Sequence, residues 1–149
     1  MNLKENVKGT KGELNIVLRD ATGNVTQEVT VPNLVVDTGL AYIASRMKDT
    51  TLSAMSHMGV GAGTTDPAAG NTALESALGA REALTSTTVT ANAIEYVATF
   101  GAGSGTGAVT EAGIFNALTS GTMLCRTEFA VINKGASDSM TITWTVTVS

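Results

Sequence analysis

The residue types that most often carry catalysis occur once each in this chain, as His57 and Cys125. A nucleophile–histidine–acid triad brings three side chains together, and Ser56 is the nearest hydroxyl in sequence. Successive residues of a strand point to opposite faces, so we expect Ser56 not to contact His57 directly. One histidine and one cysteine also fall short of the three or four ligands of a zinc site. We therefore predict that His57 packs structurally and that Cys125 packs as a small hydrophobic residue, with no intrachain disulfide.

Two glycine-rich tracts raise the question of phosphate binding. Residues 101–107 contain four glycines, but the sequence that follows them favours a strand, whereas a phosphate-binding loop leads into a helix N-terminus. No Gly-Lys-Ser/Thr motif is present. We interpret residues 101–107 as a turning loop, and Gly59, Gly61 and Gly63 as sites of close backbone approach within or beside a strand.

The 13 carboxylates are scattered along the chain, and no two of them stand out as an acid–base pair. We expect Glu75 and Glu82 to be solvated or paired with Arg81, and Glu111 lies where it could pair across strands with Arg126. No calcium-binding loop motif is present. The sequence thus predicts a protein that is not an enzyme, with no metal, no cofactor and no small-molecule substrate.

Charge is sparse: 15% of residues are charged, against about 25% in a typical soluble domain, and the net charge is −4. A surface of this kind favours a protein packed against partners, and a neutral hydroxyl-rich surface in water is the alternative. The only local basic excess is Lys4, Lys8 and Lys11, interrupted by Glu5. These lysines either are solvated or contact an acidic partner surface, and they are too few to form a nucleic-acid-binding surface.

No apolar run reaches the roughly 18 residues of a membrane span, and no signal peptide is evident.

The C-terminal residues 139–148 give the clearest structural signal. Apolar residues alternate with threonines, which puts one apolar and one hydroxyl face on a strand. Threonine is β-branched and favours the extended backbone. We predict that Trp144, on the apolar face, is buried in a β core.

The rest of the chain predicts a mainly β protein, an antiparallel sandwich or barrel-like domain over residues 13–149 preceded by a flexible arm over residues 1–12. One amphipathic helix is expected over residues 38–49, with Asp37 or Thr38 as its N-cap. A short helical turn is expected over residues 73–78. The remaining strands are expected at residues 13–19, 25–31 (ended by Pro32), 56–63, 81–90, 94–100, 111–117 and 123–132.

Several segments from residue 33 onward, in this order, resemble a group of small structural proteins of tailed bacteriophages, described as capsid decoration (cement) proteins or as tail or head fibre proteins. The segments are Asn33-Leu-Val-Val-Asp-Thr-Gly-Leu-Ala-Tyr-Ile-Ala-Ser-Arg46, Met55-Ser-His-Met-Gly-Val-Gly-Ala-Gly-Thr64, Thr72-Ala-Leu-Glu75, Thr110-Glu-Ala-Gly-Ile-Phe-Asn-Ala117, Gly121-Thr-Met-Leu-Cys-Arg126, Val131-Ile-Asn-Lys-Gly135 and the threonine-rich last strand.

The resemblance implies a virion protein made in the host bacterial cytoplasm, with no catalytic residues. The leading hypothesis is a capsid decoration protein that binds the major capsid protein and copies of itself, as a homotrimer. Lys4, Lys8 and Lys11 would then belong to a shell-anchoring arm. The alternative is a structural protein of the tail, baseplate or fibre base. A host-surface carbohydrate-binding module ranks third, because aromatic residues make up only 4% of the chain.

Overall fold

The computed structural model describes residues 10–48 and 52–148. Within them the chain is mainly β, as predicted, with one short helix. The elements in chain order are β1 (Lys11–Arg19), β2 (Val25–Val35), α1 (Asp37–Ser45), β3 (His57–Gly61), β4 (Glu82–Ala83), β5 (Ser86–Thr90), β6 (Ala93–Phe100), β7 (Gly107–Phe115), β8 (Met123–Lys134) and β9 (Ser139–Thr147).

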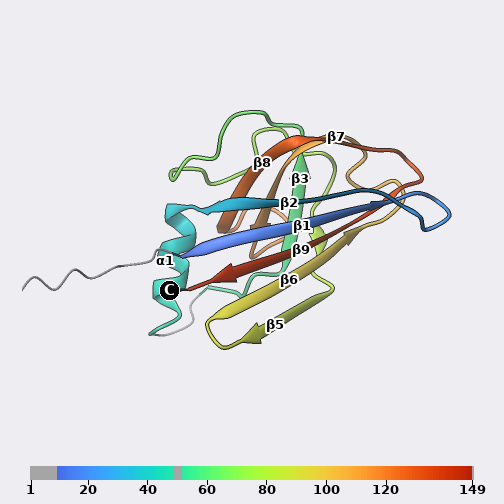
Figure 1. Cartoon of the computed structure of the whole chain (residues 1–149). Coiled ribbons are helices and arrows are strands. Elements are labelled where there is room, and N and C mark those ends of the chain that lie inside the picture. Colours follow the sequence, from blue (N-terminus) through green and yellow to red (C-terminus); the bar gives the residue numbers. More distant parts are fainter. Residues whose placement is uncertain (1–9, 49–51, 149) are drawn as a thin grey trace, which may run out of the picture.

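The strands of the described residues form one curled antiparallel sheet in the order β4-β3-β7-β8-β2-β1-β9-β6-β5 (Figure 1). Strand β2 joins two halves: most of it pairs with β1, while Leu34 and Val35 pair with Arg126 and Cys125 of β8. We call β5, β6, β9, β1 and β2 the front half, and β4, β3, β7 and β8 the back half. The curl makes the molecule half-barrel-like, which confirms the predicted fold class.

A single segment links the two outer edges of the sheet. The Leu84 N–H donates to the Ser56 carbonyl beside β3, and the next N–H, of Thr85, donates to the Val97 carbonyl of β6, at 2.9 and 2.7 Å. The chain therefore changes from one edge to the other at these two residues. The continuous strand expected over residues 81–90 is accordingly wrong, because this crossing divides it into β4 and β5.

The core lies between the two halves and contains the inward side chains of β9. Trp144 is fully buried, as predicted, opposite Leu14 of β1 and Tyr96 of β6. The alternation expected for residues 139–148 is present over the length of β9, with buried apolar residues and half-buried threonines. Because the last strand lies between β1 and β6, it holds the centre of the front half.

The β1–β2 hairpin forms as the sequence predicts, around a turn at Asp20. Asp20 Oδ1 accepts hydrogen bonds from the N–H groups of Thr22 (2.9 Å) and Asn24 (3.0 Å), and Gly23 adopts a positive φ of 89°. Pro32 does not end β2, contrary to expectation. The Pro32 carbonyl accepts a hydrogen bond from Thr127 Oγ1 of β8 and so points away from β1. The backbone nitrogen of a strand residue points to the same edge as its carbonyl, so the pairing of β2 with β1 loses no N–H donor at Pro32.

The helix is shorter than the expected 38–49, and its cap differs. It ends at Ser45, after which Met47 and Lys48 bond three residues back, to Ala44 and Ser45. Its N-cap is Val36, without a side-chain cap bond, and the Thr38 hydroxyl donates instead to the Met123 carbonyl at 2.9 Å. That contact and the close approach of Gly39 to the Leu124 backbone, which leaves no room for a Cβ, fix α1 against β8.

The boundary of the predicted arm shifts toward the N-terminus. Lys11 is the first residue of β1 and pairs with Thr147, so the domain begins before residue 13. Lys4 and Lys8 lie outside the described residues.

Candidate functional site

The back half contains a buried ion pair between β7 and β8. Glu111 is fully buried and Arg126 is 1% exposed. Arg126 Nε donates to Glu111 Oε2 at 3.0 Å, and Arg126 Nη2 lies 2.9 Å from the same oxygen. The cross-strand pair considered from the sequence is therefore confirmed.

The Glu111 carboxylate also holds the segment that connects β3 to β4. It accepts the backbone N–H groups of Gly63, Glu75 and Ser76 at 3.1, 3.0 and 2.7 Å. The neighbouring Thr110 hydroxyl donates to the Gly63 carbonyl at 2.6 Å. One acidic side chain thus fastens both ends of an irregular segment, residues 62–78, to the sheet.

These bonds explain why the helical turn expected over residues 73–78 is wrong. The N–H groups of Glu75 and Ser76 bond to the Glu111 carboxylate, and that of Leu78 bonds to the Val60 carbonyl of β3. Donors used in this way are not available for helical bonds to residues four positions earlier. A buried charge-assisted contact overrides the weak local helical preference.

The glycines of residues 59–63 are required by close approach, as predicted. A Cβ on Gly63 would lie 2.6 Å from the Glu111 carboxylate, and one on Gly61 would overlap both that carboxylate and the Ser76 carbonyl. The small residues therefore leave room for the acid and for the backbone that it binds.

Glu111 is in a poor position to act as a general base. Its two oxygens accept three backbone N–H groups and face the Arg126 guanidinium, which occupies the roughly four lone-pair sites of a carboxylate. Beside it, Arg126, Glu75, Asn71 and Thr65 line an open hollow of about 350 Å³. The chemistry that this arrangement supports is structural: a saturated acid that fixes a loop.

The remaining predicted carboxylate contacts differ from expectation. Glu75 lies near Arg126 (3.7 Å) rather than Arg81, and hydrogen bonds from Thr65 lower the pKa of its partly exposed carboxyl. Glu82 bonds to the Ser104 hydroxyl. Arg81 instead stacks on the Phe115 ring, 3.4 Å from its centroid, and donates to two carbonyls of the β7–β8 loop.

Ser56 and His57 do meet, contrary to the sequence prediction. Ser56 Oγ lies 2.8 Å from His57 Nδ1. The alternation rule fails here because β3 begins only at His57, so Ser56 is not a regular strand residue. Within residues 10–48 and 52–148, no carboxylate is hydrogen-bonded to His57, so the pair lacks the orienting acid of a triad. The expectation that the chain is not an enzyme stays a prediction.

Cys125 is fully buried, facing Val35 and Ile114 on its neighbouring strands, as the sequence indicated. Burial raises the pKa of its thiol well above the usual value, which keeps it protonated and unreactive. The described part of the chain brings together no group of three metal-ligating side chains. It contains no helix long and apolar enough to cross a bilayer.

The glycine tract 101–107 leads directly into β7, as expected, so no helix N-terminus follows it. A lysine that was not singled out from the sequence joins the loop after β6 to the turn between β8 and β9. Lys134 is 2% exposed and donates to the carbonyls of Gly101 and Asp138 at 2.9 and 2.8 Å. Its partners are backbone atoms of two separate loops, so residue types and spacing carried no signal for it.

The outer surface of the front half is a broad sheet face, on which Glu13 and Glu95 lie opposite Thr145 and Lys11 lies opposite Thr147. We call it the threonine face and define it by the outward threonines of β9 and their cross-strand neighbours. Its two central rows are Val97–Thr143–Asn15–Thr30 and Thr99–Thr141–Val17–Glu28, running from β6 across β9 and β1 to β2.

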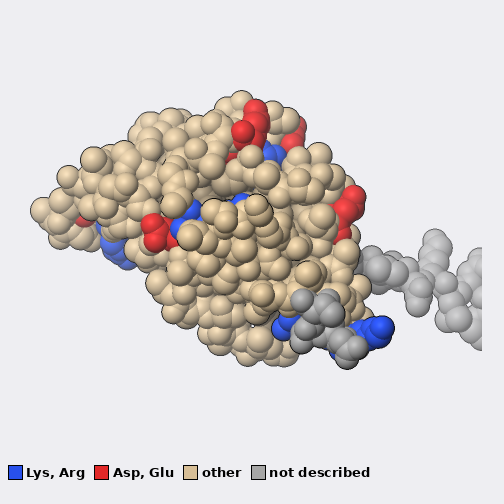
Figure 2. Space-filling view, turned by 180° about the vertical axis from the view of Figure 1, so that it is seen from behind, with Lys and Arg blue, Asp and Glu red and all other residues tan. Residues whose placement is uncertain are grey.

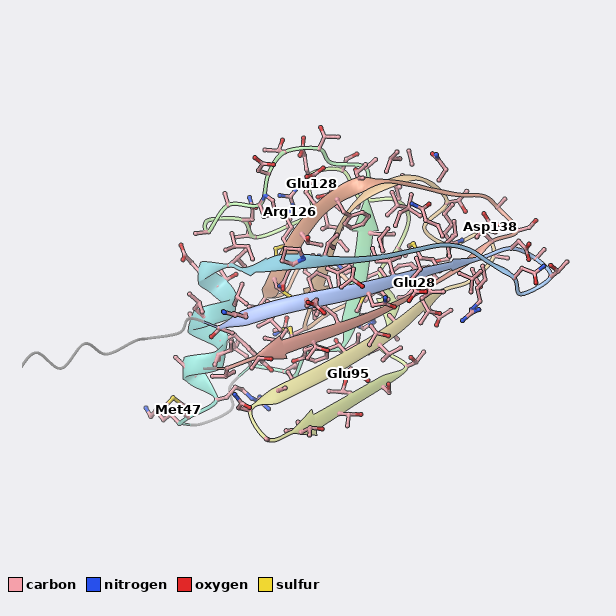
Figure 3. All side chains as sticks on the ribbon, in the orientation of Figure 1. Glu28, Met47, Glu95, Arg126, Glu128 and Asp138 are labelled. Atoms are coloured by element: carbon pink, nitrogen blue, oxygen red, sulfur yellow. The ribbon has the colours of Figure 1, made fainter. Side chains whose placement is uncertain are left out.

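Neighbouring polar groups on the threonine face bond to one another. The hydroxyls of Thr99 and Thr141 are 3.1 Å apart, and Asn15 Nδ2 donates to Glu28 (3.1 Å) and Thr30 (3.2 Å). Glu28 is the charged residue of the two central rows. Glu28 and Glu95 are seen on the front half in Figure 3. The opposite side of the molecule likewise has its charged atoms in small, separate groups (Figure 2).

Comparisons of the chain with protein-family models, with curated proteins and with solved structures find no match.

Proposed function

We propose that this chain is a structural protein of a tailed-bacteriophage virion that decorates the capsid, binding the major capsid protein as a homotrimer and stabilising the assembled shell. The observation that carries the proposal is the threonine face. It spans four paired strands, and its two central rows present hydroxyl, amide and small apolar groups with Glu28 as their one charged residue. Burying these central rows against another protein limits the desolvation cost of charged groups, which are depleted from interface cores.

The resemblance to phage structural proteins gives the proposal its partner. Its segments include Glu111 and Arg126 with residues 62–64 and 72–75 of the loop that Glu111 fixes, and they also include the threonine-rich strand β9. The resemblance therefore covers part of the scaffold and one of its surfaces. That composition suits a protein whose work is adhesion.

The described part of the chain begins at one end of the threonine face, which supports a joint role of this end and the face in attachment. Lys11 pairs with Thr147 at one end of the face, and a hollow of about 540 Å³ lined by Lys11, Glu13, Thr145 and Thr147 lies there. In the proposed attachment, Lys4, Lys8 and Lys11 contact the same partner as the face.

The test is binding of the purified protein to shells that lack it, measured by co-sedimentation. Thr143→Lys places a charge at the centre of the threonine face and should weaken binding at least about tenfold. The matched control, Leu118→Lys, adds the same charge to an exposed residue of the β7–β8 loop in the other half and should bind normally. Equal binding by both variants would rule out the threonine face as the contact.

Copy number separates the proposal from its alternative. Hundreds of copies per particle, from quantified virion protein bands, would agree with shell decoration, whereas six to a few dozen would indicate the tail, baseplate or a fibre base. Particles without the protein should still assemble but rupture at lower temperature, because ligands that bind only the assembled state stabilise it by mass action. Equal thermal resistance of the two particle types would contradict a stabilising role.

A further inference from the structure

One end of the molecule, where α1 meets the β5–β6 hairpin, is apolar and hollowed. A hollow of about 230 Å³ is lined chiefly by the apolar and aromatic side chains of Tyr42, Ile43, Met55, Ile94 and Tyr96, together with Arg46, whose guanidinium lies over the Tyr42 ring. A second hollow, of about 210 Å³, lies on the other side of Ile94 and includes Val89 and Val148. The two share Ile94 and so form one continuous surface, which we call the apolar end.

Large apolar side chains stand exposed around these hollows. Met47, just after α1, is 89% exposed, and Val89 on β5 is 70% exposed, the two highest values among the large hydrophobic residues of the described chain. Val148 is 45% exposed and is held at the hairpin by its N–H bond to the Asn92 carbonyl. Figure 3 shows Met47 projecting from the same end of the molecule as the β5–β6 turn. Clustered exposure of this kind marks an interaction surface more often than scattered residues do.

Strand β5 adds an unprotected sheet edge to the apolar end. It is the last strand on its side of the sheet, and within the described residues no strand pairs with its outer side. Natural edges are usually guarded by lysine, proline or a bulge, yet Ser86–Thr90 contains no charged residue and no proline, and its register with β6 is regular. All five residues are exposed. This edge is chemically suited to pairing with another strand.

We propose that the apolar end is the contact between copies of this chain, with Met47 of one copy entering the hollow beneath Tyr96 of the next. A protruding side chain and a hollow on one end of the same chain are the two complementary parts that a closed symmetric assembly needs. Methionine is flexible and fills irregular apolar gaps well. Val89 of β5 lies at the same end, and its strand contains no charged residue that would oppose the contact.

The contact leaves the threonine face free. Tyr96 and Ile94 point to the inner side of β6, whereas the threonine face is made by the outward residues of the same half. Both surfaces can therefore be occupied at the same time. The inference names the self-association surface of the proposed homotrimer, and it rests on the proposed function only for the number of copies.

The test is the molar mass of the full chain in solution, measured by light scattering over a wide concentration range. The wild-type protein should have close to three times the mass of one chain. Met47→Glu and Val89→Lys, at exposed sites that the monomer does not need for folding, should each raise the dissociation constant at least about tenfold and yield single chains.

The matched controls are Leu118→Glu and Val131→Lys, which change exposed apolar residues elsewhere (53% and 47% exposed) and should leave the mass unchanged. Circular dichroism checks that each variant is folded. A monomeric wild type, variants that keep the wild-type mass, or controls that dissociate equally would each overturn the inference. A two-chain mass abolished by both variants would support the contact and overturn the number of three.

Shell binding distinguishes this inference from the proposed function. A trimer that dissociates in the two variants but does not bind shells would contradict decoration and leave the contact standing. A protein that coats shells while remaining monomeric would contradict the contact and leave decoration standing.

Discussion

The front and back halves of the sheet are held together by different means. In the front half, β1, β9 and β6 pair in unbroken register and are stabilised by the apolar side chains beneath them. In the back half, one buried carboxylate binds an arginine and three backbone N–H groups of an irregular segment. The contrast teaches that a repetitive pattern builds a surface, whereas a single polar group can determine a loop. We expect the two halves to respond differently to substitution.

The largest effect should follow from Glu111→Ala. The change leaves the Arg126 guanidinium buried without the Glu111 carboxylate, which costs about 3–5 kcal/mol. It also leaves the three backbone N–H groups that donate to Glu111 without their acceptor. We expect the free energy of unfolding to fall by at least about 5 kcal/mol, measured by urea denaturation. Glu111→Gln, which keeps the shape and part of the acceptor capacity, should retain more stability. A loss of less than about 1 kcal/mol in the alanine variant would contradict the central role of Glu111.

Trp144→Ala should have the next largest effect, in the front half. The side chain is fully buried, and its removal should cost about 3–5 kcal/mol through lost transfer energy and the cavity left behind. Thr145→Ala, the outward neighbour on the same strand, is the control and should change stability by less than about 0.5 kcal/mol. A denaturation midpoint unchanged by Trp144→Ala would show that the apolar side of β9 is not what stabilises the front half.

An alkaline loss of stability should come in part from Tyr96, beside the buried thiol of Cys125. Burial raises the pKa of this phenol above its usual value near 10, so the folded state keeps a proton that the unfolded state loses. Stability is therefore independent of this group below about pH 10 and falls above it, by up to about 1.4 kcal/mol for each pH unit.

Tyr96→Phe tests that dependence. The variant should resist alkaline unfolding better than the wild type in denaturant titrations between neutral and strongly alkaline pH. Identical pH profiles for the two proteins would mean that Tyr96 does not contribute to the alkaline loss, which Cys125 would then explain.

The smallest effect on stability should come from the centre of the threonine face. Thr143→Lys should change the free energy of unfolding by less than about 0.5 kcal/mol, because the side chain points outward from a regular strand. The same urea titration compares the loss of unfolding free energy in Thr143→Lys with that in Glu111→Ala. We expect a small loss for Thr143, a surface residue, and a large loss for Glu111, which stabilises the fold. A loss above about 2 kcal/mol would show that the face is needed for folding.

The sequence predicted what depends on local periodicity. Trp144 and the alternation of β9, the β1–β2 hairpin with its turn at Asp20, and the mainly β architecture all follow from patterns within one or two strands. The Glu111–Arg126 pair was also within reach, because opposite charges lay on two expected neighbouring strands.

The errors arise where contacts between distant residues decide the conformation. Residues 73–78 carry a weak helical preference that Glu111, far away in sequence, overrides by binding their N–H groups. Pro32 stays within β2 because its N atom faces away from β1, which no local rule indicates. The division of residues 81–90 depends on which edge each N–H meets. Lys134 could not be recognised, because its acceptors are carbonyls of loops whose meeting required the complete fold.

The central position of β9 also has a consequence for how the chain folds during synthesis. Leu14 and Ile16 of β1 lie opposite Trp144 and Ile142 of β9, which are more than a hundred residues later in the sequence. The strand that pairs with this edge of β1 is therefore synthesised last. Until β9 is made, the edge of β1 that it pairs with presents backbone N–H and C=O groups without a strand partner. Closure by pairing so distant in sequence is slow, and the unpaired side of β1 is the part most prone to aggregate meanwhile.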